Sequence, residues 1–185
     1  MATQVEFKTI SDLEAIPDDG NRYELIEGEI LMSRAPGITH QRTLRNLMEC
    51  FFIYLASNPV GETLPGPGLI FDEHNAVIPD LVFISNRRRE RIMAGERLVG
   101  APELVIEIVS PGKENEERDK ETKARLYGKF GVKEYWIVDP ESQDVAIHVW
   151  NRSGHRVTYL STSGEITSPR ILPGFACKVG DIFDI

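Results

Sequence analysis

The stretch from residue 103 to residue 140 constrains the fold most strongly, because strand and helix patterns alternate along it. Two short runs rich in β-branched residues, ELVIEIVSP and EYWIVDP, flank a polar stretch at residues 114–130 that has helical periodicity and ends at Gly131. Neighbouring parallel strands need a long crossover, usually a right-handed one through a helix. The pattern therefore predicts a parallel strand pair joined by a helix, in a mixed α/β fold.

The remaining segments predict helices packed on a curved sheet, with an antiparallel meander at the C-terminus. Helices are indicated at residues 6–15 and 39–56 by capping residues and by apolar residues spaced three and four apart. YELIEGEILMS is typical of a hairpin, and GLIFDE and VIPDLVFIS are typical of strands. DVAIHVWNR, HRVTYLST, EITSPRIL and FACKV predict the meander. Since no repeat or Pro/Ser-rich linker interrupts the chain, we expect one domain over residues 1–185.

The charge balance argues against a protein that coats nucleic acid through bulk charge. The 185 residues include 21 Lys and Arg against 29 Asp and Glu, a net charge of −8. The charge is uneven, however, because residues 86–133 carry twelve basic and nine acidic residues, a balance of +3, which leaves −11 on the rest. A local basic site therefore stays possible on an acidic protein.

The two cysteines and the N-terminus bear on the cellular location. Cys50 and Cys177 form no CxxC pair and belong to no Cys/His cluster, so the sequence predicts neither a disulfide scaffold nor a zinc site. A reducing, cytoplasmic location is expected. The polar N-terminus lacks a signal-peptide pattern, and no stretch approaches the ~18 apolar residues of a membrane span. We expect no membrane association.

Two carboxylates lie in unusually apolar surroundings. Strand alternation places Asp80 on one face with Val82 and Ile84, and Glu107 among aliphatic residues. A buried carboxylate is costly without a compensating cation, and two of them in successive strands suggest a shared Mg²⁺ or Mn²⁺, with the Ile108 carbonyl completing a partial set of ligands. The alternative is structural: Asp80 caps a turn and Glu107 pairs with an arginine.

A lysine on the following helix adds a third group. Asp119, Lys123 and Tyr127 are spaced four apart and share one helical stripe, which directs Lys123 towards the carboxylates. Two acids and a lysine suit metal-assisted phosphodiester hydrolysis, in which the lysine orients the nucleophile or stabilises the developing anion. The alternative is an Asp119–Lys123 salt bridge, worth only about 0.3–0.5 kcal/mol.

For the other polar residues, the sequence allows two interpretations or indicates no functional role. A basic run is suited to DNA phosphates but equally to a solvated helix face; its members are Arg87, Arg88, Arg89 and Arg91. Asp139, directly before Pro140, is typical of a turn. His148 and His155 show no mutual ligand spacing.

Several short motifs, taken in order, resemble the Uma-two family of restriction-endonuclease-like proteins, within the PD-(D/E)xK nuclease superfamily. They cover nearly the whole chain: Tyr23-Glu24-Leu25-Ile26-Glu27-Gly28-Glu29-Ile30, Met32, His40, Pro79-Asp80, Glu107-Ile108-Val109-Ser110-Pro111, Asp119-x3-Lys123-x3-Tyr127, Gly131-Val132-Lys133-Glu134-Tyr135-Trp136-Ile137-Val138-Asp139-Pro140 and Leu172-Pro173-Gly174-Phe175. The resemblance implies a restriction-endonuclease-like core, with a curved mixed sheet flanked by helices.

The resemblance also implies roles for individual residues. Asp80 and Glu107 correspond to the metal-binding acids of the family. The superfamily's usual lysine, two positions after the second acid, is replaced by Val109, and Lys123 is its counterpart on the next helix. Glu24 corresponds to an early third carboxylate. His40 occupies the family's histidine position, and we group it with the arginines as a DNA contact.

Together these observations predict a Mg²⁺- or Mn²⁺-dependent DNA endonuclease without an organic cofactor. Because double-strand cleavage requires two active sites or sequential nicks, a homodimer is expected. The alternative is an inactive nuclease-fold module that binds DNA or regulates, and the missing lysine beside Glu107 favours it. A fold by itself does not establish activity.

Overall fold

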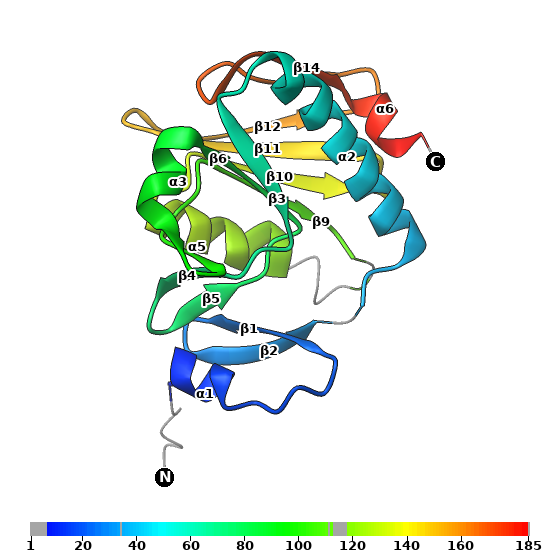
Figure 1. Cartoon of the computed structure of the whole chain (residues 1–185). Coiled ribbons are helices and arrows are strands. Elements are labelled where there is room, and N and C mark those ends of the chain that lie inside the picture. Colours follow the sequence, from blue (N-terminus) through cyan, green and yellow to red (C-terminus); the bar gives the residue numbers. More distant parts are fainter. Residues whose placement is uncertain (1–6, 34, 111, 113–117, 185) are drawn as a thin grey trace.

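The computed structural model describes residues 7–33, 35–110, 112 and 118–184. These residues form two six-stranded sheets, a separate two-stranded sheet and several helices (Figure 1). The predicted mixed α/β class is confirmed, with two large sheets in place of one. Within the described ranges, no helix has the length and apolar character to cross a membrane.

The central sheet has the strand order β12-β11-β10-β9-β6-β3. Its strands are β3 (Gly61–Pro65), β6 (Leu81–Ser85), β9 (Leu104–Ile108), β10 (Glu134–Asp139), β11 (Asp144–Asn151) and β12 (Gly154–Leu160). β9 and β10 are parallel, and every other neighbouring pair in this sheet is antiparallel. The parallel pair predicted from the sequence is therefore confirmed.

The crossover between β9 and β10 is helical, as predicted. A π-helical turn, η1 (Arg118–Thr122), leads into α5 (Lys123–Phe130), and residues 114–117 of the predicted helix lie outside the described residues. Gly131 ends α5 with φ 85°, a left-handed conformation that glycine adopts without steric cost. Its N–H donates to the carbonyls of Gly128 and Tyr127. The helix therefore ends here, and the chain continues into β10.

The second sheet has the order β2-β1-β5-β4-β8-β7. Its strands are β1 (Arg22–Ile26), β2 (Glu29–Ser33), β4 (Leu69–Asp72), β5 (Asn75–Val77), β7 (Met93–Ala94) and β8 (Arg97–Val99). β1 and β2 form the predicted hairpin, and its turn residues Glu27 and Gly28 both have positive φ, at 51° and 78°. Two consecutive positive φ angles are typical of the tight turn that matches strand twist.

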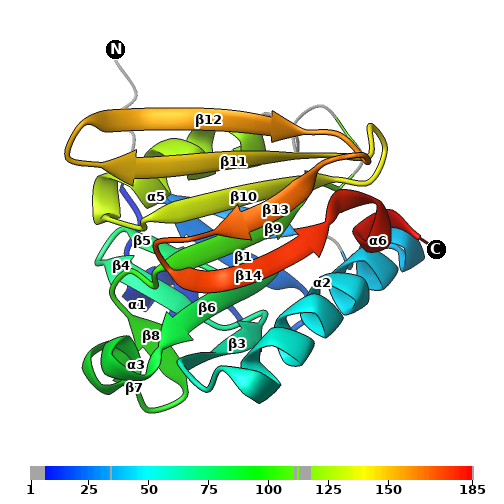
Figure 2. The same ribbon diagram turned by 90° about the horizontal axis from the view of Figure 1, so that it is seen from above.

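Helices cover the central sheet on both faces (Figures 1 and 2). On one face lie α2 (Ile38–Ser57), the hairpin β13 (Glu165–Ser168) and β14 (Leu172–Lys178), and α6 (Val179–Phe183). On the other face lie α5 and the second sheet, with α1 (Ile10–Glu14) beyond it; α3 (Asn86–Ile92) follows β6. α1 has Thr9 as its N-cap.

Strand β9 is buried on both faces, which explains its aliphatic sequence. Leu104 and Ile106 pack in the hydrophobic cluster beneath α2, whereas Val105 and Val109 pack in the cluster beneath α5. A strand between two helical layers has no solvent-facing side, and its sequence is therefore a continuous run of apolar residues. Glu107 is the exception in this run, and it faces the α5 side.

Two strand predictions were wrong in detail. VIPDLVFIS is not one strand, because β5 belongs to the second sheet and β6 to the central sheet. Pro79 has no N–H to donate, and the chain passes between the sheets there, so Asp80 lies in a bend rather than in a strand. The C-terminal meander comprises β10, β11 and β12 only, while β13 and β14 pair separately.

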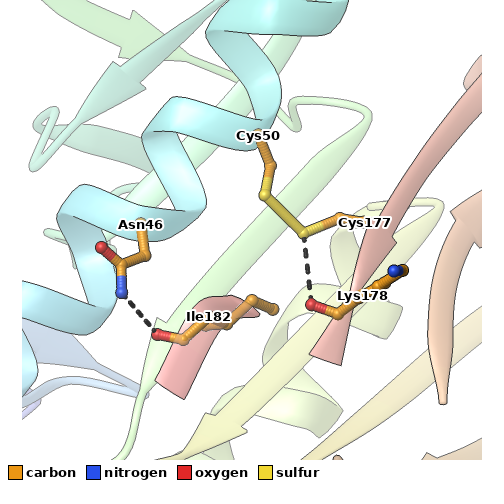
Figure 3. Close-up of a disulfide and its surroundings, with 5 residues drawn as sticks. All are labelled: Asn46, Cys50, Cys177, Lys178 and Ile182. Atoms are coloured by element: carbon orange, nitrogen blue, oxygen red, sulfur yellow. Dashed lines mark hydrogen bonds between the residues drawn. A yellow bond between two sulfur atoms is a disulfide. The ribbon is translucent and has the colours of Figure 1, made fainter. Parts of the chain in front are cut away.

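A disulfide joins Cys50 on α2 to Cys177 on β14 (Figure 3), which corrects the expectation of two free cysteines. Nearby, the Asn46 amide donates to the carbonyls of Ile182 and Asp184 at 3.1 and 3.0 Å. α2 is therefore tied to the C-terminal segment by covalent and polar contacts. The two cysteines are 127 residues apart, so only the packing of α2 on the hairpin brings them together.

A second contact not foreseen joins His148 and His155. The β11–β12 hairpin places their Nδ1 and Nε2 atoms 3.1 Å apart, and the ring of Trp150 stacks on that of His155. Burial, together with the neighbouring His155, lowers the pKa of His148 from 6.5 to about 4. His148 is therefore neutral at physiological pH.

The disulfide predicts redox-dependent stability. Reducing it frees a 127-residue loop in the unfolded chain, and we expect a loss of about 2–4 kcal/mol in the free energy of unfolding. Urea unfolding with and without a phosphine reductant measures the difference. The double variant Cys50→Ser/Cys177→Ser serves as the control and should not respond to reductant. Equal stability of oxidised and reduced wild type would contradict the prediction.

The His148 environment predicts a loss of stability in mild acid. Because the folded-state pKa lies below the ordinary value, this contribution is complete above pH 6.5 and is lost as the pH falls towards 4. We expect His148→Gln to flatten the dependence of unfolding free energy on pH between these values. Urea titrations at several pH values measure it, and parallel pH profiles for variant and wild type would refute it.

Candidate active site

The two predicted metal-binding carboxylates lie at one end of the β6–β9 ladder. The last paired residues are Leu81 and Ile106, and one step further the chain reaches Asp80 and Glu107. The Asp80 carboxylate accepts a hydrogen bond from the backbone N–H of Ile108 at 2.7 Å. The bend after Pro79 thus holds Asp80 beside the residue that follows Glu107. The structure brings these two acids together.

Helix α5 supplies two donors to Glu107. Lys123 Nζ and the Tyr127 hydroxyl both donate to Glu107 Oε1, at 2.8 and 2.7 Å. They are four residues apart, so both project from one side of α5, as the sequence predicted. All three side chains are buried. The side chain of Asp119, the other predicted member of this stripe, lies outside the described residues.

Glu24 joins the site from the second sheet. Its Oε1 lies 3.1 Å from Lys123 Nζ and accepts the backbone N–H of Ile78 at 2.8 Å. Lys123 therefore bridges two carboxylates, Glu24 on β1 and Glu107 on β9, and links the two sheets through α5. Among the described residues, the buried Oε2 of Glu24 has no hydrogen-bond partner.

Charge and burial are balanced within this group. An isolated buried charge is strongly unfavourable, whereas an ammonium between two carboxylates compensates a large part of the cost. Burial raises the pKa of Tyr127 well above 10, and the nearby carboxylate of Glu107 raises it further. The phenol therefore keeps its proton and acts as a fixed donor to Glu107.

His40 is buried beside Asp80. It belongs to the first turn of α2, is only 6 % exposed, and its Nε2 lies 3.0 Å from Asp80 Oδ2. No described residue pairs with its buried Nδ1. The structure therefore places His40 in contact with a site carboxylate, because α2 packs its N-terminal turn against the bend after Pro79, and the DNA contact of His40 stays a prediction.

The arginine run forms the helix α3, at the opposite end of β6 from Asp80. Five strand residues separate the two positions, about 17 Å at ~3.3 Å per residue, so the structure does not bring the run to the carboxylates. Arg89 pairs with Glu62 at 3.4 Å on the surface. Phosphate binding by Arg87, Arg88, Arg89 and Arg91 stays a prediction.

Lys120 and Asp139 form a pair near the site that the sequence did not reveal. Lys120 Nζ lies 3.0 Å from Asp139 Oδ2, at the end of β10 beside the end of β9. Burial raises the pKa of Asp139, but hydrogen bonds from Lys120 and from the N–H groups of Ser142 and Glu141 outweigh it and lower the pKa. The position of Lys120, three residues before Lys123, was the available signal. Asp139 also caps the predicted turn.

The donor atoms fit a magnesium ion held by few protein ligands. Among the described residues, no group of three His, Cys, Asp or Glu side chains is placed to hold a metal. Mg²⁺, however, is commonly held by one or two carboxylates and keeps several waters. Asp80 and Glu107 provide that pair, and the unpartnered Oε2 of Glu24, whose other oxygen contacts Lys123, provides an acceptor for water. The residues present therefore fit this cofactor.

Fold and site together define a chain of the restriction-endonuclease-like class. The model of the Uma2 family, described as "Putative restriction endonuclease", matches residues 10–180, and the chain therefore belongs to that family. A similar solved structure is a "putative nuclease belonging to DUF820" from Anabaena variabilis, with 18% identity, a TM-score of 0.75, and coverage of 95% of this chain and 97% of that one. No curated protein matches the chain.

The buried ion pairs of Lys123 with Glu24 and Glu107 predict that Lys123 contributes more to stability than the neighbouring Lys120. Lys123→Met leaves Glu24 and Glu107 buried without their cation, and we expect a loss of about 3–5 kcal/mol in the free energy of unfolding. Lys120→Met, the matched control, breaks a pair whose lysine is 42 % exposed; because Asp139 keeps hydrogen bonds from the N–H groups of Glu141 and Ser142, the loss should be only about 1 kcal/mol. Chemical denaturation measures both, and equal losses would disprove the assignment.

Proposed function

We propose that this chain is a Mg²⁺- or Mn²⁺-dependent endonuclease that hydrolyses phosphodiester bonds in DNA, acting as one domain over residues 1–185. The observation that supports it best is the convergence of Asp80, Glu107 and Lys123 at the end of one strand ladder. Two acids and an amine at one strand end match the requirements of phosphodiester hydrolysis. Membership of the Uma2 family points to the same chemistry.

In this proposal Asp80 and Glu107 hold the metal ion, and the Ile108 carbonyl is a further ligand. When bound, Mg²⁺ screens the charge of the phosphate and activates water. The Ile108 N–H donates to Asp80 and fixes one ligand, and Tyr127 donates to Glu107 and fixes the other. His40 contacts the same Asp80 oxygen, Oδ2, as the Ile108 N–H does. Both carboxylates are thus oriented before a substrate arrives.

Lys123 supplies the positive charge of the site. Its ammonium orients the attacking water or stabilises the negative charge that develops on a phosphate oxygen. Glu24 acts on the reaction through Lys123, because its Oε1 holds the amine beside Glu107. A lysine on α5 thereby takes the place of the superfamily lysine that Val109 replaces on β9.

DNA binding is proposed to be weak and local. The net charge of −8 opposes tight non-specific binding, whereas the arginines of α3 are suited to phosphate contacts at one side of the molecule. The Cys50–Cys177 disulfide removes the argument from free cysteines, so a cytoplasmic location is proposed from the DNA substrate alone. We also propose a homodimer, since double-strand cleavage requires two active sites or sequential nicks.

Plasmid nicking tests the function directly. We expect wild type to nick supercoiled plasmid with Mg²⁺ or Mn²⁺ and not with a chelator, and Asp80→Asn to be slower by at least about 100-fold. Asp80→Asn keeps the size of the side chain and removes its charge. Glu141→Gln, which makes the same carboxylate-to-amide change at an exposed turn, is the matched control and should retain full activity.

A thermal-shift experiment separates an active nuclease from a binding module. A metal that binds only the folded protein raises its Tm, and Asp80→Asn should abolish the rise. Folded wild type that binds DNA without cleaving it, and whose Tm does not respond to either metal, would refute the nuclease proposal and favour the non-catalytic module.

A further inference from the structure

The outer side of α2 carries an exposed stripe along its whole length. Its members are spaced alternately four and three residues apart, which keeps them on one face of the helix: Ile38, Arg42, Arg45, Glu49, Phe52 and Ala56. Figures 1 and 2 show α2 at the edge of the molecule with no other element on its outer side. We call these six residues the α2 stripe.

The α2 stripe exposes more apolar surface than a solvated helix needs. Ile38 is 74 % exposed, Phe52 is 73 % exposed and its neighbour Ile53 is 69 % exposed. Around Phe52 the surface is hollowed between Arg45, Met48, Glu49, Ile53 and Ala56. Phe52 and Ile53 thus form one apolar patch bordered by charged residues, and Ile38 lies separately at the other end of α2. An exposed apolar patch rimmed by charged residues typically marks an interface.

From this stripe we infer that α2 binds α2 of a second copy of the chain, in antiparallel orientation. Arg45 and Glu49 lie one turn apart on the stripe. A parallel two-fold pairing sets each residue against itself, so it brings two Arg45 side chains together and two Glu49 side chains together. Antiparallel pairing about residue 47 instead sets each Arg45 against the Glu49 of the other copy, and this favourable contact occurs twice.

The same register pairs the rest of the stripe. Ile38 meets Ala56 of the other copy, an apolar contact, and Arg42 meets Phe52, whose ring is suited to a guanidinium. Every position of the α2 stripe therefore finds a complementary partner in one arrangement. α2 is a helix of 20 residues, about 30 Å long, so the contact extends over roughly that length.

This interface gives the proposed homodimer a location, and its biological meaning rests on the proposed nuclease function. The physical association does not depend on catalysis, because no residue of the α2 stripe belongs to the candidate site. Failure of the interface and failure of the nuclease are therefore separate results. A monomeric enzyme would still nick plasmid, and an inactive protein would still dimerise.

Sedimentation of the full-length protein over about 1–300 µM tests the inference. A single helix pair is a small interface, so we expect a reversible dimer with a dissociation constant in about the micromolar range, weakened by 1 M salt. Arg45→Glu and Glu49→Arg should each weaken self-association by at least about tenfold, because each sets like charges against one another. Tyr159→Glu, at an equally exposed aromatic on β12, is the control and should not change it.

Mixing the two charge variants provides the decisive result. Arg45→Glu presents two acids and Glu49→Arg presents two bases, so an equimolar mixture should form a heterodimer although neither variant dimerises alone. Recovery on mixing also shows that both variants are folded, and both should retain wild-type nicking. Wild type that is monomeric over the whole range, a dimer insensitive to both substitutions, or no association on mixing would overturn the inference.

Discussion

The ion pairs of Lys123 with Glu24 and Glu107 connect the main parts of this protein. The lysine comes from α5, one carboxylate from the central sheet and the other from the second sheet, and all three are buried. Removing Lys123 leaves two carboxylates buried without their cation, which is far less favourable than leaving exposed charges unpaired. The bridge therefore fixes how the helix and the two sheets are placed, and in doing so it fixes the amine beside the predicted metal ligands.

The surrounding structure is arranged to hold this group in place. β9 lies between two apolar layers and cannot shift without exposing aliphatic side chains on one face or the other. Asp80 Oδ2 is held by the backbone N–H of Ile108 and by His40, and His40 belongs to α2. The disulfide and Asn46 in turn tie α2 to the C-terminal segment. A chain of specific contacts thus extends from the C-terminal hairpin to the candidate active site.

A large part of the fold follows from local patterns. The apolar periodicity of α2, the strand-helix-strand succession around α5 and the Glu27-Gly28 turn each predicted an element that the structure contains. Prediction was wrong where tertiary context decided. The run around Pro79 continues the strand pattern, but its two halves belong to different sheets. β13 and β14 do not extend the predicted meander, because they form a separate two-stranded sheet. Periodicity reports which side of a segment is buried and does not report which sheet buries it.

For the candidate site, the sequence by itself determined which chemical groups are available. These are the acid Asp80, the acid Glu107 within an apolar strand, and the side chains of Lys123 and Tyr127 on one stripe of α5. Alternation and helical spacing are local, so they fixed which side each residue faces. Only the tertiary structure decided that Glu24 shares Lys123, that His40 supports Asp80, that Cys50 meets Cys177, and that the basic helix α3 lies away from the acids. These contacts join residues that are distant in the chain. They arise from the packing of helices and sheets against one another, and this packing produces no periodic pattern in the sequence.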